Sequence, residues 1–347
     1  MTRKQELNDM NAIACILVIL IHVLSLGISS SNPESWQAAV VYFPWRLSAF
    51  VVPMFLYTGA VKMTLYFETE KITVKLYLTY CLQRIKKIYI PYVIWVVIYY
   101  ICFLQIGYVR GQLREFLSYL AIGNLSSPFY YVIIIMQFYF LMPLWIWLIR
   151  HVPVYLAFTV SLFITFCMQQ CTYVLSVFEI DFPYSDRIFL MYITLWVVGL
   201  YTGKYYDIAV SMLRGVSKSI ACGAVVFICV ILSYIQYSRG LYLFNSNDIK
   251  LVSDLLSIAL LHNICLEFTR APTFVRSFLQ RVYRSSFFVY LSHCLFLTLT
   301  THFMLQNGLN RLSELLPARF FVCYTVPFLM YEMKQWCASK LSHQRGV

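Results

Sequence analysis

Long apolar runs without charges recur along the chain and constrain its fold more than any other feature. A helix needs about 20 mostly apolar residues to cross the roughly 30 Å hydrocarbon core of a bilayer. The segment 113–122 is apolar but too short, which indicates a re-entrant or interfacial piece. The sequence predicts an all-α polytopic membrane helix bundle of about ten transmembrane helices, in one domain over residues 1–347. The predicted spans are 9–27, 39–63, 88–106, 130–149, 153–175, 188–204, 219–236, 251–268, 285–304 and 318–334.

The charged residues support this class and orient the chain. They make up 12% of the chain, whereas soluble domains carry about 25%. The net charge of +12 comes from Lys and Arg in the connections between apolar runs, which favours an orienting role over nucleic-acid binding. With the N-terminus inside, eighteen Lys and Arg fall in inner connections and six in outer ones. Both termini are therefore predicted to be cytoplasmic.

The eleven cysteines show no CxxC pairing. Cysteine inside an apolar helix acts as a small hydrophobic residue. The sequence therefore predicts neither a disulfide framework nor a metal site.

Four ionisable side chains lie at predicted membrane depth, where their cost makes each a functional candidate. His22 stands in an otherwise apolar first helix, and Arg46 lies at similar depth on the next helix. We expect them to line one cavity, where the fixed cation favours a neutral imidazole. His293 lies near mid-membrane and His262 lies further toward the inner side. Each histidine could instead be a hydrogen-bonded packing residue, and Arg46 could snorkel to the outer interface.

A basic cluster precedes the third predicted span, in the sequence CLQRIKKIYIPY. It contains Arg84, Lys86 and Lys87, followed by Pro91. Such a cluster is an ordinary cytoplasmic anchor. Lys and Arg also suit the phosphates of a nucleotide-containing donor. Both interpretations stay open.

Five segments carry a family resemblance in the right order and spacing over nearly the whole chain: NAIACILVILIH, FVVPMFLYTGAV, RIKKIYIPYVIW, PFYYVIIIMQFYFLMPLW and SSFFVYLSHCLFL. Together they resemble the acyltransferase-3 family of integral membrane acyltransferases. The resemblance implies transfer of an acetyl- or succinyl-type group from cytoplasmic acyl-CoA to a hydroxyl of a cell-envelope polysaccharide or glycolipid. It implies a multi-pass protein of a bacterial plasma membrane, with His22 as general base or acyl carrier.

One position departs from the pattern of that family. Asn11 stands where the family commonly has an Arg that assists the donor. The resemblance therefore implies donor binding at Asn11, and the change bears on donor identity and on activity. Arg84, Lys86 and Lys87 are the other candidates for donor binding, because basic side chains suit phosphates.

The expected chemistry is consistent with these residues. Acylating a sugar hydroxyl needs a base for its proton, which His22 would supply. It also needs a group that stabilises the oxyanion, for which Arg46 or His293 would serve. A GxSxG motif is absent from the sequence, so a serine nucleophile has no support.

Two other classes of function remain open. A polysaccharide or lipid-linked sugar exporter or flippase would use Arg46 and stack sugars on aromatic helices, although no repeat of two halves is visible. A membrane scaffold or sensor would use the polar residues for packing alone. The expected partners are the lipid bilayer, acyl-CoA as donor substrate and an envelope carbohydrate, without nucleic acid or metal.

Overall fold

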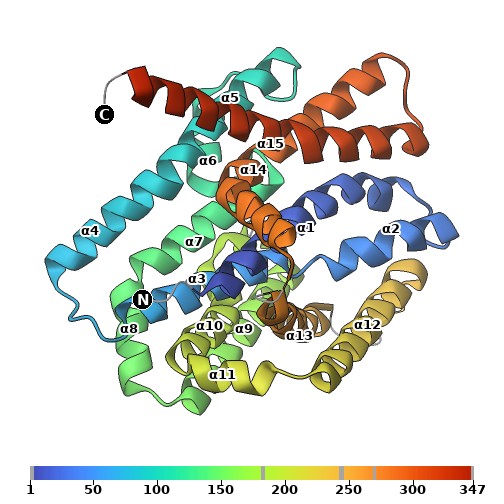
Figure 1. Cartoon of the computed structure of the whole chain (residues 1–347). Coiled ribbons are helices and arrows are strands. Elements are labelled where there is room, and N and C mark those ends of the chain that lie inside the picture. The colour runs from blue at the N-terminus through green and yellow to red at the C-terminus, as the bar shows by residue number, and fades with distance from the viewer. Residues whose placement is uncertain (1–3, 181–183, 242–245, 269–270, 345–347) are drawn as a thin grey trace. The chain divides into compact units, whose positions relative to one another are not determined.

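Helices dominate the computed structural model, which describes residues 4–180, 184–241, 246–268 and 271–344. The chain is 86% helical, and its described residues contain no strand (Figure 1). A helix satisfies every backbone N–H and C=O internally, which a hydrocarbon environment demands. Within these residues, eight helices are long and apolar enough to cross a membrane, or nine if one bent pair is counted as a span. The predicted all-α membrane bundle is confirmed.

The elements follow one another without a large insertion between them. In chain order they are α1 (Gln5–Ser30), α2 (Trp36–Leu47), α3 (Val51–Phe67), α4 (Val74–Arg84), η1 (Ile85–Tyr89), α5 (Ile90–Gln105), α6 (Leu113–Ile122), η2 (Ser127–Phe129), α7 (Tyr130–Phe140), α8 (Met142–His151), α9 (Val154–Val177), η3 (Ser185–Arg187), η4 (Phe189–Tyr192), α10 (Ile193–Lys204), α11 (Tyr206–Leu213), α12 (Val216–Arg239), α13 (Ser246–Glu267), α14 (Thr273–Gln306) and α15 (Leu312–Gln344).

Each predicted span lies over a helix, but the details differ. The span 39–63 consists of α2 and α3, separated by a turn. The segment 188–204 corresponds to the shorter apolar helix Phe189–Lys204. The short segment 113–122 is α6, which forms the bent pair with Ser127–Phe140 at 52°. Gly123 ends α6 with a φ of +72°, where a Cβ would lie 2.9 Å from the Phe129 carbonyl.

Residue contacts divide the chain into two units. The first comprises Met1–Val51, Cys222–Leu256 and Ile264–Val347, and the second comprises Val52–Ala221 and Ser257–Asn263. Every boundary between them falls inside a helix, in α3, α12 or α13. The expectation of one domain stays a prediction, as does the side of the membrane on which the termini lie.

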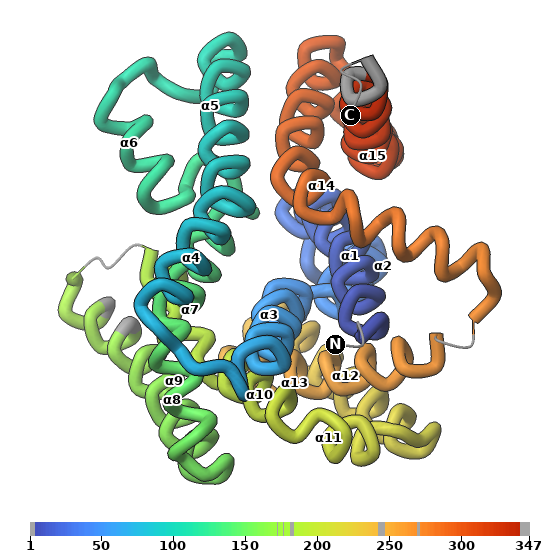
Figure 2. Tube along the Cα trace, turned by 60° about the vertical axis from the view of Figure 1, so that its left-hand side comes forward, coloured from blue at the N-terminus to red at the C-terminus, as the bar shows by residue number. Residues whose placement is uncertain are grey.

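The first unit is built around α1, which packs against α2, α14 and α15. The two long helices α14 and α15 also pack against each other, as Figure 2 shows. The Tyr324 hydroxyl of α15 donates to the Ile16 carbonyl of α1 at 2.7 Å. The chain's first helix is therefore held by its last two.

The second unit contains a close helix pair, α3 and α10. A Cβ on Gly199 would lie 2.6 Å from the Tyr57 carbonyl oxygen, and one on Gly203 would lie 2.7 Å from Thr64 Cβ. Beside this contact the rings of Phe138 and Trp196 stack at 4.3 Å. Glycine at both positions lets the α10 backbone approach α3 closely.

The helix from α4 to α5 is continuous but contains the five-residue π-helix η1. A π-turn is rare, and it changes the direction of the side chains that follow it. Lys86 and Lys87 lie on this turn and are exposed, whereas Arg84, just before it, is half-buried. The π-turn therefore separates the three basic residues that the sequence places together.

Candidate active site

Two histidines from opposite ends of the chain lie together in the first unit. The His22 ring on α1 and the His293 ring on α14 have centroids 5.2 Å apart. His293 is fully buried and His22 is half-buried. They are paired because α1 packs directly against α14. An imidazole pair at this depth is suited to proton transfer.

The hydrogen bonds of His293 define its tautomer. Its Nδ1 lies 3.0 Å from the Val289 carbonyl oxygen. A carbonyl oxygen can only accept, so Nδ1 carries the hydrogen. In the neutral ring Nε2 then holds a free lone pair, and the Cys294 sulfur lies 3.4 Å from it. His293 is thus oriented as a base toward Cys294.

The cation Arg319 on α15 lies beside this pair of histidines. Its Nη2 donates to the His22 carbonyl oxygen at 2.8 Å, and its Nη1 donates to Thr301 Oγ1 at 3.0 Å. The side chain is only 4% exposed, and its Nε is buried without a hydrogen-bond partner among the described residues. Its charge acts on both His22 and Cys294. The site therefore contains a cation that is fixed by two hydrogen bonds, and its Nε–H is a third donor that can bind a substrate oxygen.

Arg319 was not singled out in the sequence because it falls at the edge of the last predicted span. The sequence does carry a signal, an arginine two residues after Pro317 and directly before the apolar run 320–331. Burial inside the bundle, which is the informative property, depends on tertiary packing.

The structure places Arg46 in another cluster of the same unit. Arg46 is 9% exposed and interacts electrostatically with Tyr42 and Asp254. The Tyr42 ring stacks on Tyr237 at 4.8 Å, and Tyr234 lies 5.3 Å from Tyr42. Asp254 is 2% exposed and binds Lys250 Nζ at 2.5 Å. Three tyrosine rings, one acid and two cations are thus gathered here.

Asn11 and His262 lie in different surroundings. Asn11 is half-buried on α1, in the same helical stretch as the buried polar side chains of Glu6, Asn8 and Asp9. His262 belongs to the second unit, where its Nδ1 hydrogen-bonds the Tyr57 hydroxyl at 3.0 Å. That bond is typical of a histidine that packs within a core.

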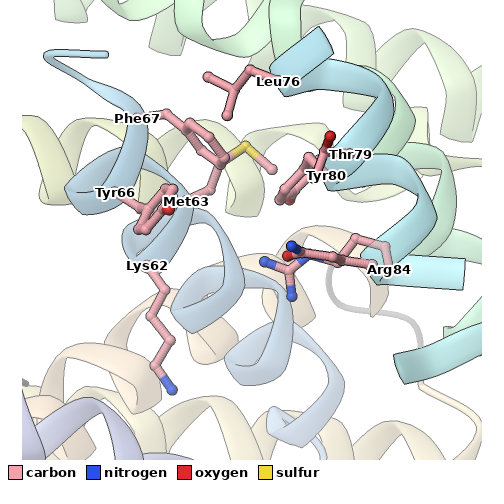
Figure 3. A pocket seen from close by; sticks show the side chains of 9 residues that line it. Lys62, Met63, Tyr66, Phe67, Leu76, Thr79, Tyr80 and Arg84 are labelled. Carbon is pink, nitrogen blue, oxygen red and sulfur yellow. The ribbon is translucent and has the colours of Figure 1, made fainter. Parts of the chain in front are cut away.

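Arg84 lines a cavity of about 250 Å³ in the second unit. Figure 3 shows its guanidinium extending from α4 toward α3, which contributes Lys62 to the same cavity. The guanidinium also lies over the rings of Tyr80 and Tyr139, at 4.7 and 4.5 Å. Lys86 and Lys87 are not among its lining residues. Two cations at one cavity could hold phosphate groups of a cofactor-sized donor.

The ligand atoms of His22, His293 and Cys294 all lie within 4.8 Å of one another. Two imidazoles and a thiolate are ligands that Zn²⁺ accepts. These residues could therefore hold such an ion, and the expectation that the protein uses no metal stays a prediction.

The profile of a family described as an acyltransferase domain matches residues 6–331. The chain belongs to the acyltransferase-3 family. The match covers all three helices that form the histidine site, α1, α14 and most of α15. No curated protein and no solved structure matches the chain closely enough to count as a relative.

Membership of the acyltransferase-3 family confirms the resemblance and supports a membrane acyltransferase. It does not by itself assign roles to residues.

Proposed function

We propose that this acyltransferase-3 protein transfers an acetyl- or succinyl-type group from cytoplasmic acyl-CoA to a hydroxyl of a bacterial cell-envelope polysaccharide or glycolipid. The observation that carries the proposal is the group of two imidazoles and one guanidinium formed by half-buried His22 with buried His293 and Arg319. O-acylation needs a base for the hydroxyl proton and a positive donor for the oxyanion, and this group supplies both.

His22 takes the proton of the acceptor hydroxyl in this mechanism. Arg319 donates from Nε to the carbonyl oxygen of the acyl group as negative charge develops there. The guanidinium is already fixed by its bonds to His22 and Thr301, so little reorganisation is needed during the reaction.

The two other clusters are assigned to the two substrates. Arg84 and Lys62 contact donor phosphates, with Lys86 and Lys87 adding positive charge at the exposed surface. Asn11 influences which donor is accepted. Arg46, with its neighbouring tyrosine rings, contacts the carbohydrate acceptor, since aromatic faces stack on sugars.

The test compares envelope polysaccharides by mass spectrometry in a strain that lacks the gene. The gene is restored as wild type, His22→Ala or His151→Ala, the last being a matched control because His151 is exposed on α8. We expect His22→Ala to reduce the polymer ester by at least ~100-fold, the usual loss when a general base is removed. Full esterification by a normally expressed His22→Ala variant would contradict the proposal.

A polysaccharide or lipid-linked sugar exporter is the second candidate. The tyrosine cluster around Arg46 favours it, because a transported sugar would use the same stacking faces. The same strains separate the two functions. An exporter predicts loss of surface polymer on deletion and its recovery with His22→Ala, whereas an acyltransferase predicts polymer without its ester.

A further inference from the structure

One group at the site is not used by the mechanism above. The Cys294 thiol is 4% exposed and contacts Nε2 of His293 at 3.4 Å. The bond from His293 Nδ1 to the Val289 carbonyl leaves Nε2 free to accept a proton. A thiol, a base and a group that orients the base are the parts of an activated nucleophile.

Neighbouring buried cysteines differ in what they face. Cys15 donates to the Ser286 carbonyl at 3.7 Å, and Cys323 donates to the His293 carbonyl at 3.6 Å. A carbonyl oxygen cannot take a thiol proton at ordinary pH, so these contacts are structural. Cys294 faces an imidazole nitrogen, which can take the proton and form the reactive thiolate.

Stabilisation of an oxyanion is also available at Cys294. Arg319 interacts electrostatically with Cys294, and its Nε is a buried donor without a partner among the described residues. A tetrahedral centre on the Cys294 sulfur would therefore form within reach of a fixed positive charge. His22 lies in the same cluster, with its nearest ligand atom within 4.8 Å of the Cys294 sulfur.

We propose that Cys294 carries the acyl group as a thioester between donor and acceptor. This inference rests on the proposed acyltransferase function and adds a covalent intermediate to it. The donor and the acceptor then need not occupy the site at the same time.

In the first step His293 Nε2 takes the thiol proton of Cys294, and the thiolate attacks the thioester carbonyl of acyl-CoA. A bond forms between the acyl carbon and the Cys294 sulfur, and the bond to the coenzyme A sulfur breaks. Coenzyme A leaves as a thiol with the proton held on His293. One thioester replaces another, so no external energy source or oxidant is required.

In the second step the acceptor hydroxyl attacks the thioester on Cys294. Its proton passes to His22 as the oxygen–acyl bond forms and the sulfur–acyl bond breaks. The Cys294 thiolate then takes a proton from His22, which restores both groups. Arg319 stabilises the oxyanion in both steps.

The first test uses the purified full-length protein with acyl-CoA and without acceptor. The acyl group of this acyl-CoA is the same as that of the ester found on the polymer. After an acid quench, mass spectrometry of peptides is expected to find the acyl mass on Cys294. Neutral hydroxylamine should remove it, as it does thioesters. Acylation of His293 or of another residue in place of Cys294 would overturn the proposal.

The second test follows exchange of labelled coenzyme A into acyl-CoA without acceptor, since exchange requires only the first step. We expect exchange in the wild type, in His22→Ala and in the matched control Cys323→Ala. We expect at least a 100-fold loss in Cys294→Ala and in the closely isosteric Cys294→Ser. Thermal unfolding of each variant shows whether a loss reflects misfolding.

The outcomes separate this inference from the proposed function. If the wild-type gene restores the polymer ester and Cys294→Ala restores it equally, the thioester is excluded while the acyltransferase stands. The thioester is also excluded if the wild type restores the ester but shows no exchange of labelled coenzyme A. If the wild type restores no ester, the proposed function itself fails.

Discussion

At the residue scale, the bonds of Arg319 link three helices at the candidate active site. The guanidinium of α15 binds His22 on α1 and Thr301 on α14, and its Nε remains available. Lysine would keep the charge. Its single ammonium group cannot form both bonds and at the same time offer a third donor in the same plane, as the guanidinium does. We expect Arg319→Lys to lower kcat by about 100-fold or more, the usual cost of removing one oxyanion donor.

The measurement for Arg319→Lys is the rate of ester formation on the envelope polymer, with protein level determined in the same cells. Arg311→Lys is the matched control, because Arg311 is an exposed residue just before α15. A rate within twofold of wild type in Arg319→Lys would show that the guanidinium fork has no part in the reaction.

The histidines of the site were predicted from the sequence, whereas Arg319 and Cys294 were not. His22 and His293 stand out because each is a polar residue within an apolar run. Cys294 gives no such signal, since cysteine in a helix is usually a small hydrophobic residue. Its importance comes from the direction of His293 Nε2, which depends on a backbone hydrogen bond.

The expected pairing of His22 with Arg46 shows the limit of reasoning from depth. The two residues lie on neighbouring helices, and α1 does pack against α2. Depth along a helix follows from residue number at about 1.5 Å per residue. The direction around the axis depends on packing, which places Arg46 with Tyr42 and Asp254 and places Arg319 beside His22.

At the element scale, the contact between α3 and α10 depends on the absence of side chains at two positions. An alanine Cβ at Gly199 would lie 2.6 Å from the Tyr57 carbonyl oxygen and 2.8 Å from Ala60 Cβ. Both are backbone or rigid neighbours, so the helices must separate. We expect Gly199→Ala to destabilise the protein by about 1–3 kcal/mol, measured as a lower thermal unfolding midpoint in detergent.

Gly59 on α3 offers the matched control for this contact. A Cβ there would meet its nearest atoms at 3.5 Å, which is ordinary van der Waals contact. Gly59→Ala should leave the unfolding midpoint unchanged or raise it slightly. Equal midpoints for Gly199→Ala and the wild type would contradict the close approach of the α10 backbone to α3.

The positions of the helices were more predictable than their breaks. Each apolar run became a helix because hydrocarbon leaves the backbone few other ways to satisfy its polar groups. The turn between α2 and α3 at 48–50 was not predicted, because the apolar pattern continues through it. The π-turn η1 was not predicted either, since its Ile-Lys-Lys-Ile-Tyr sequence is compatible with an ordinary helix.

At the scale of the whole molecule, the distribution of Lys and Arg predicts the orientation of the chain. A fluorescent protein fused after the last residue should fluoresce, and alkaline phosphatase at the same place should be inactive, because both report a cytoplasmic end. Phosphatase fused after Gly111, in a predicted outer connection, should be active and serves as the matched control. Activity of the C-terminal phosphatase fusion would reverse the predicted topology.

The pairing of α1 with α14 and α15 also has a consequence for how the protein is made. His22 leaves the ribosome 297 residues ahead of Arg319, and His293 and Cys294 also follow it late along the chain. Helix α1 must therefore reside in the membrane without these partners of its imidazole until α14 and α15 have been synthesised. A chain that terminates before α14 lacks the second imidazole, the thiol and the cation together, so it cannot assemble the site.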